Sequence, residues 1–511
     1  MIRAYAFWRR RFYIIMELVV SLGWRGNCLR LLCVIGVFTN KLIMNTIMKR
    51  ITKIKLFAMM ALFVVLTSCD EQLDNAINAS KVTSIAIDFS NIEEKFIDDE
   101  NVLLLPMGGE LALPFTILPS EVSNVEVTLT SSDPSVISTN GQTMKALKEG
   151  ETNITAQVGN KIAEVSVKVV SDMIFTPLTF EAAFDNVTVK LNRYTHAFEN
   201  VFYSCDDGKS WSKLPNEGVV LKKAGDKVAF RASNPKYYPY RFMVDINDPG
   251  NANIDETVPL CYVYGNVMSL TNEENFSTSK ELVASAFTGL FREAPIDIVK
   301  GEKKLVLPAL KFGRLCYHNM FRDCTALTTM PELPATTLSS ECYAYMFTGC
   351  KSLKNVTPLP ASKLTTGCYR HMFAKCSSLT EFPKLEAQTL ADGCYSYMFN
   401  DCISLIVAPQ LPETELKTSC YYAMFSGCSS LKTAPILPAK ALVLGCYERM
   451  FYKCTSLASI TCLAEKDFDN EYVADWLTNV SPTGTFVKSA NANFWTSGDN
   501  IPAGWTIENA N

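Results

Sequence analysis

Histidine is scarce in this chain, whose 511 residues include 18 cysteines but only three histidines, His196, His318 and His371. No two cysteines have the C-x-x-C spacing. Cys/His zinc sites need ligands in such tight clusters, so the sequence argues against a metal site. The net charge is −4, and no basic face stands out beyond the extreme N-terminus. Because nucleic-acid binders must neutralise phosphates with Lys and Arg, we expect no nucleic-acid partner.

The common catalytic motifs are missing as well. The sequence has no G-x-S-x-G elbow, no H-E-x-x-H motif, no P-loop and no credible Cys/His pair. These motifs place a nucleophile, a metal or a phosphate for reaction. We therefore expect no enzyme activity and no cofactor. A pair of carboxylates is the one catalytic arrangement that the sequence leaves open.

The N-terminal region has the layout of a secretory signal. A basic segment from Met48 to Lys55 precedes an apolar run, Leu56 to Leu66, which is short for a membrane span. The following Leu66-Thr67-Ser68-Cys69 resembles the lipobox of bacterial lipoproteins. The resemblance implies a signal peptide over 48–68, a lipid on Cys69 and a polar tether over 69–80. It also implies a membrane partner through that lipid. We expect residues 1–47 to be an upstream, unstructured stretch, with Met48 as the true start; an additional transmembrane helix is the alternative.

Two β domains are expected next. Residues 81–171 alternate apolar and polar residues in short runs, a pattern typical of a β-sandwich. The order Ser131–Ser138, Asn140-Gly141 and Ala146–Thr152 resembles the bacterial Ig-like group 2 family, in which such modules act as spacers. Residues 172–260 are predicted to form a second β domain with an Asp-Gly hairpin at Asp207-Gly208. Asp206 and Asp207 fit turn chemistry better than a calcium loop, because spaced oxygen ligands are missing.

An internal repeat of 26 residues dominates the C-terminal half. Each unit contains C-Y-x-x-M-F-x-x-C followed by a leucine and, in most units, Leu-Pro. The first cysteines are Cys316, Cys342, Cys368, Cys394, Cys420 and Cys446, and the second are Cys324, Cys350, Cys376, Cys402, Cys428 and Cys454. A seventh, degenerate unit places Ala286 and Ala294 at the two cysteine positions.

The spacing of the apolar residues within a unit predicts one face of a helix of about two turns. Ser340, Thr366, Asp392 and Thr418 are suitable N-caps, and Gly349 and Gly427 are suitable stops. A short extended run through the leucine would complete each unit. We therefore expect a multidomain chain in which β-sandwich domains precede an α/β leucine-rich-repeat solenoid.

The repeat cysteines have three interpretations: disulfides, metal ligands or small buried residues. Two cysteines eight residues apart on a helix would be ~12 Å apart, too far for a disulfide. Bridges between neighbouring repeats remain possible, since an exported protein permits oxidation. The alanines of the degenerate unit favour tight packing positions over ligands or bridges. Buried free thiols are our main interpretation.

The C-terminal half resembles the BspA-like leucine-rich-repeat family of bacterial surface proteins. The resemblance covers a solenoid at 261–460, with six clear repeats and the degenerate one, and a cap at 461–511. Trp476, Phe486, Trp495 and Trp505 would cover the last repeat. The resemblance implies a non-catalytic protein, displayed on the outer membrane surface, that adheres to host or extracellular macromolecules. A surface glycan-binding lipoprotein for nutrient capture is the alternative.

The candidate binding surface is a variable stripe on the outward side of the repeats. The third residue after each first cysteine is not constant, as expected of positions that contact solvent or a ligand. The stripe contains Asn319, Tyr345, His371, Tyr397 and Arg449, with Arg370 and Tyr422 beside it. A solvated face without a ligand is the alternative interpretation of each residue taken alone.

Overall fold

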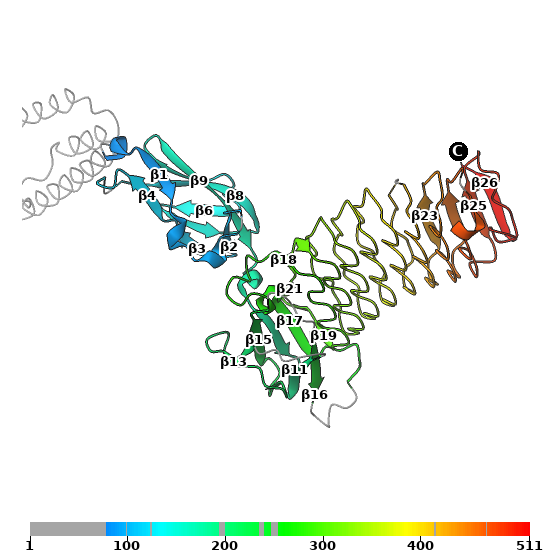
Figure 1. The fold of residues 1–511 in the computed structure, drawn as a ribbon, viewed down its shortest axis with the longest axis horizontal. Helices are drawn as coiled ribbons and strands as arrows, with labels where there is room; N and C mark the ends of the chain where they lie inside the picture. The colour runs from blue at the N-terminus through cyan, green and yellow to red at the C-terminus, as the bar shows by residue number, and fades with distance from the viewer. Residues whose placement is uncertain are drawn as a thin grey trace, which may run out of the picture. The chain divides into compact units, whose positions relative to one another are not determined.

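A computed structural model describes residues 78–98, 100–122, 125–193, 200–234, 240–246, 254–412, 415–466 and 468–510. The upstream stretch 1–47, the predicted signal peptide and Cys69 lie outside these residues. Within them the chain is built mainly of strands and turns (Figure 1). The short 3-10 helices are η1 (Phe89–Asn91), η2 (Glu94–Phe96), η3 (Asp172–Phe175), η5 (Val267–Leu270) and η6 (Asn470–Tyr472). No helix in this part of the chain is both apolar enough and long enough to cross a bilayer.

The first β region contains two larger sheets and a strand pair. One sheet has the order β2 (Leu103–Pro106), β9 (Lys161–Val170), β8 (Gly150–Val158), β5 (Thr128–Ser131). The other has β3 (Glu110–Ala112), β7 (Thr143–Ala146), β6 (Ile137–Asn140), and β1 (Ser84–Ile87) pairs with β4 (Phe115–Leu118). Alternate residues are buried along β8, as period-two patterning predicts. Asn140 pairs with Thr143 across a turn at Gly141, so Asn140 and Gly141 lie at the tip of a hairpin.

The second β region contains the predicted hairpin. β12 (Val201–Ser204) pairs with β13 (Ser212–Lys213), and Asp207 and Gly208 have positive φ in the turn between them. The carboxylate of Asp206 accepts hydrogen bonds from Ser204 and Ser210, so it closes the turn as predicted. A separate sheet has the order β14 (Val219–Leu221), β11 (Val187–Arg193), β16 (Tyr240–Ile246).

The main sheet of this region continues into the first part of the repeats. Its order is β13, β12, β15 (Lys227–Ala232), β10 (Leu178–Ala182), β17 (Cys261–Asn266), β21 (Lys303–Val306), β20 (Val299–Lys300), with β19 (Ile296–Asp297) also on β17. β17 pairs antiparallel with β10 and parallel with β21. The expected boundary between residues 260 and 261 therefore falls inside one sheet.

The C-Y-x-x-M-F-x-x-C segment is not a helix, so the predicted two-turn helix is wrong. It is a series of four-residue turns in which every fourth residue has positive φ, and in the first repeat Tyr317 has positive φ as well. In repeat 2, which starts at Cys342, these residues are Glu341, Tyr345 and Gly349. The apolar positions i, i+1, i+4, i+5 and i+8 have a period of four, which matches these turns better than the 3.6 residues of a helix.

The hydrogen bonds of this segment alternate between two directions. The N–H groups of Tyr343, Tyr345 and Phe347 donate to carbonyl oxygens of the next repeat at 3.0, 2.8 and 2.9 Å. The N–H groups between them, such as that of Met346, donate to the third residue back in the same turn. The same alternation recurs along the stack except at Tyr317, whose N–H donates back to the Ala286 carbonyl at 2.9 Å, and we call the inter-repeat bonds the ladder. The residues predicted as N-caps instead accept ladder bonds through their backbone carbonyl groups. Thr366, for example, accepts from the N–H group of Glu341 at 3.0 Å.

Gly349 and Gly427 do not stop a helix but occupy positive-φ positions, with φ of 76° and 80°. A Cβ atom at Gly349 would lie 2.2 Å from Asp323 Oδ1, and one at Gly427 would lie 2.1 Å from Asp401 Oδ1. The positive φ favours glycine there, and the Asp side chain of the preceding repeat lies in the space that a Cβ atom would take.

A continuous apolar interior runs along the stacked repeats, as the sequence predicts. The Met, Phe and both Cys side chains of all six repeats are 0% exposed. The phenylalanines form a column in which neighbouring ring centroids are 5.4–5.7 Å apart. The degenerate unit continues it, since Phe291 stacks on Phe321 at 5.4 Å.

The repeat cysteines are buried free thiols, in agreement with the main interpretation. Each second cysteine donates its S–H to a phenylalanine carbonyl oxygen in the preceding unit, as Cys376 does to Phe347 at 3.2 Å. Equivalent bonds of 2.9–3.1 Å are made by Cys324, Cys350, Cys402, Cys428 and Cys454. Burial raises the pKa of the Cys368 thiol to about 12, so these groups remain protonated.

The region expected to be a cap begins with another coil of the same kind. Asp475 and Asn479 have positive φ at the equivalent positions, and Trp476 replaces the repeat methionine. The extended runs also continue as a parallel sheet of β23 (Thr433–Leu437), β24 (Ser459–Cys462), β25 (Gly484–Lys488) and β26 (Trp505–Asn509). At the other end, β18 (Glu281–Leu282) pairs with β22 (Lys311–Phe312). The aromatic residues Trp476, Phe486, Trp495 and Trp505 are all buried.

The tyrosine of the repeat motif offers a test of this interior. Tyr369 is buried, and its hydroxyl has no hydrogen-bond partner among the described residues. Tyr369→Phe should therefore raise the free energy of unfolding by about 1 kcal/mol, because it removes an uncompensated buried hydroxyl. Urea unfolding measures this change. Tyr264→Phe is the control, since the Tyr264 hydroxyl donates to Glu181 at 3.1 Å and its loss should destabilise. Equal destabilisation by both variants would contradict the account.

Candidate binding surface

One position of each turn segment has an unusual backbone conformation. The third residue after the first cysteine has positive φ in every repeat, at 57° for Asn319, 59° for Tyr345, 54° for His371, 58° for Tyr397, 50° for Ala423 and 54° for Arg449. Glycine adopts this conformation most easily, and the degenerate unit uses Gly289 there. Bulky residues in this conformation are uncommon and cost about 1–3 kcal/mol each. Rings at such positions are therefore candidates for a functional role.

Three predicted residues form a stack of rings. The His371 ring lies between Tyr345 and Tyr397, at centroid distances of 4.5 and 4.2 Å and interplanar angles of 9° and 11°. Because neighbouring repeats are in register through the ladder, each ring lies one repeat from the next. The stack is half-buried, and its edges face solvent.

The stack is extended at both ends by residues one position earlier in the repeat. His318 meets Tyr345 edge to face at 5.5 Å, and the Tyr422 ring lies 5.1 Å from Tyr397. At these two ends the usual position holds Asn319 or Ala423, which have no ring. We call His318, Tyr345, His371, Tyr397 and Tyr422 the ring column.

His318 was not among the predicted site residues. The sequence does contain a signal for it: where the variable position holds a residue without a ring, the residue just before it has one. His318 precedes Asn319 in this way, and Tyr422 precedes Ala423. Asn319, which was predicted, adds no ring, and its side-chain oxygen is buried without a hydrogen-bond partner within the described residues.

Two of the predicted residues are cations beside the column. Arg370 immediately precedes His371, is exposed, and forms no ion pair with any described residue. Arg449 lies in repeat 6, beyond the last ring of the column, and its Nη2 atom is 3.4 Å from Oδ2 of Asp475. The surface thus combines ring edges and phenol hydroxyls with one paired and one unpaired guanidinium.

His318, His371 and Tyr397 are neutral at physiological pH. Burial is the main cause that lowers the pKa of His371 to about 4, and the nearby Arg370, Arg322 and Lys375 cations add to it. Burial also lowers the pKa of His318 and raises that of Tyr397 to about 12. A neutral imidazole can stack closely on both tyrosines without bringing another charge near the arginines. No cluster of His, Cys, Asp and Glu fit for a metal is found over the described ranges.

The repeats match a known family model. Residues 316–432 and 384–470 match the BspA type leucine rich repeat region, in 6 copies. The predicted repeats are thereby confirmed, and the chain carries BspA-type leucine-rich repeats. A comparison with curated proteins gave no match.

The depressed pKa of His371 predicts a pH dependence of stability. Between pH 6.5 and about 4 the unfolded chain binds a proton at His371 that the folded chain does not. The free energy of unfolding should therefore fall as the pH is lowered through this window. With allowance for solvent screening, we expect a contribution of about 1–2 kcal/mol.

His371→Phe keeps a ring in the stack and removes the titrating group, so it should reduce the pH dependence by that amount. Urea unfolding of both proteins at pH 7.5 and 4.5 provides the comparison, and carboxylate titration cancels between them. An NMR titration that gave His371 a pKa of 6.5 or above would refute the prediction.

Proposed function

We propose that this chain, which carries BspA-type leucine-rich repeats, is a non-catalytic bacterial surface lipoprotein that adheres to a host or extracellular protein. In this proposal a lipid on Cys69 holds the chain at the outer membrane. The Ig-like β region acts as a spacer, and the repeats form a solenoid that displays the ring column. The observation that carries the proposal is the ring column with its two arginines on the outward side of the repeats.

The chemistry of the column favours a protein ligand. Tyrosine and arginine are enriched among the residues that dominate protein–protein binding energies. Tyr345, His371 and Tyr397 are held by packing against one another, so little side-chain entropy is lost on binding. The unpaired Arg370 can form a bidentate ion pair with a carboxylate of the ligand.

The same geometry is less suited to a glycan. A sugar ring stacks on an exposed aromatic face, whereas both faces of His371 and one face of each adjoining tyrosine are covered. Only ring edges and hydroxyl groups are available along the middle of the column. Glycan capture would then depend on the end rings alone.

A role without catalysis agrees with the state of the nucleophilic residues. The repeat thiols are fully buried, and burial raises the pKa of Cys420 to about 12. A catalytic cysteine needs a thiolate that can reach a substrate.

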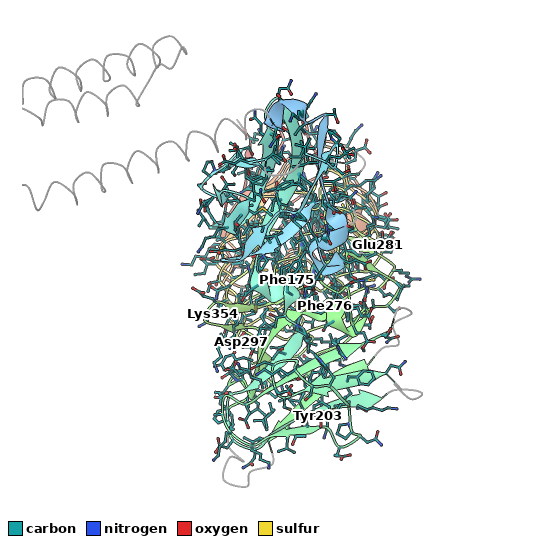
Figure 2. All side chains as sticks on the ribbon, turned by 90° about the vertical axis from the view of Figure 1, so that its left-hand side faces the viewer. Phe175, Tyr203, Phe276, Glu281, Asp297 and Lys354 are labelled. Atoms are coloured by element: carbon teal, nitrogen blue, oxygen red, sulfur yellow. The ribbon has the colours of Figure 1, made fainter. Side chains whose placement is uncertain are left out.

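Binding to a panel of extracellular matrix proteins, beside a glycan array, tests the ligand class. Arg370→Ala and Tyr397→Ala should each weaken binding to the recognised matrix protein by about 30-fold or more, as expected of central hot-spot residues. Lys354→Ala is the matched control, because Lys354 is an exposed cation of repeat 2 outside the column, labelled in Figure 2.

Surface plasmon resonance gives the affinities, and circular dichroism checks the fold of each variant. Binding to saccharides alone would favour the glycan alternative. Unchanged affinity in both column variants would remove the column from the binding site.

The membrane anchor has its own test. Cys69→Ala should abolish incorporation of radiolabelled palmitate and release the chain from the membrane fraction, because the thiol of Cys69 is the proposed acyl acceptor. Cys205→Ala serves as control, since Cys205 is an exposed cysteine outside the lipobox. Protease treatment of intact cells should degrade the wild-type chain. A fragment that is protected until lysis would contradict surface display.

A further inference from the structure

One repeat departs from the others on an exposed part of its surface. In repeat 4, which starts at Cys394, the side chains of Ile403, Ile406 and Val407 are 48, 50 and 59% exposed. We call these three residues the aliphatic patch. It follows the second cysteine, whereas the ring column lies between the two cysteines.

The equivalent positions of the other five repeats hold no large apolar residue. They are Thr325, Lys351, Ser377, Ser429 and Thr455 for the first position, Thr328, Lys354, Thr380, Lys432 and Ala458 for the second, and Thr329, Asn355, Glu381, Thr433 and Ser459 for the third. The fold therefore does not require apolar side chains here. Folding therefore does not account for three exposed aliphatic residues in one repeat. Exposed apolar patches of this kind mark interaction sites.

Opposite charges flank the patch on the two neighbouring repeats. Glu381 occupies the third position in repeat 3, and Lys432 occupies the second position in repeat 5. Lys432 is in backbone contact with the patch, since its N–H donates to the Ile406 carbonyl at 3.2 Å. Both charged side chains are exposed, and neither forms an ion pair with any described residue.

This arrangement is complementary to itself. A two-fold axis that runs across the stack at repeat 4 brings the patch of one copy against the patch of the other. It also brings repeat 3 of each copy against repeat 5 of its partner. Glu381 of one copy then faces Lys432 of the partner subunit, and the pair forms twice in the interface.

We infer that the aliphatic patch is a self-association surface, through which two copies of this chain pair antiparallel with Glu381 opposite Lys432. The patch is small beside the ~800 Å² per partner of a stable interface, so the dimer is weak, with a Kd on the order of 100 µM. The inference does not depend on the ligand of the ring column.

Sedimentation velocity at 5 to 500 µM tests this surface, with the chain from residue 70 onward, which keeps every described residue. The wild type should pass from monomer to dimer over this range. Ile403→Ser, Ile406→Thr and Val407→Thr together install residues that other repeats carry, so the fold should be kept and dimerisation should weaken at least 10-fold. Leu444→Thr is the control: Leu444 is 52% exposed at a position where two other repeats hold threonine, outside the patch, and its replacement should leave the dimer unchanged.

Charge reversal tests the pairing itself. Glu381→Lys or Lys432→Glu alone should weaken the dimer about three- to ten-fold, and the double reversal should restore it. A wild-type chain that remains monomeric at 500 µM would overturn the inference. So would a dimer that the triple replacement leaves intact, or single reversals that the double variant does not rescue. A monomeric chain whose triple variant loses adhesion to the matrix panel would assign the patch to a foreign protein instead.

Discussion

The ladder of hydrogen bonds between successive repeats is the constraint on which the repeat structure depends. From the second repeat onward every second N–H of the turn segment donates to the next repeat, and the N–H groups between them close the turns. Either set of hydrogen bonds alone would leave about half of the buried N–H groups without an acceptor. Unpaired polar groups away from water are costly, so both sets are needed. A single repeat lacks the acceptors for half of its amides. Stacking is therefore required by the backbone as well as by the apolar side chains.

The ladder also determines what the surface can display. Because the ladder aligns each repeat with the next in register, equivalent side chains form columns, both in the apolar interior and on the surface. Inside, identical phenylalanines and thiols fill the interior in stacks. Outside, the residues at the third position after the first cysteine need not be identical, so this position holds a ring in some repeats and Asn319 or Arg449 in others. A uniform interior and a variable exterior follow from the same register, which suits a scaffold for binding.

Much of this arrangement could be predicted from the sequence, because it depends on periodicity. The repeat register, the buried cysteines and the hairpin at Asp207-Gly208 follow from spacing and turn chemistry. The prediction of a helix was wrong because apolar residues at nearly four-residue spacing fit both an α-helix and a series of four-residue turns. The hydrogen bonds of the ladder distinguish these two backbone conformations. The alignment of Tyr345, His371 and Tyr397 in one stripe followed from their shared position in the repeat, whereas their stacking and the contribution of His318 from a neighbouring position did not. The sheet across residue 261 pairs segments far apart in the sequence, which local patterns do not reveal.

Hydrogen exchange of individual backbone amides tests the ladder most directly. The N–H groups of Tyr343, Tyr369 and Tyr395 donate to the next repeat, whereas those of Asp475, Leu477 and Asn479, in the last coil, have no acceptor among the described residues. The first three should exchange only through unfolding of the stack, and the last three at rates near those of an unstructured peptide. Equal protection of the two groups, as a helix with bonds to the fourth residue back would give within its interior, would contradict the account.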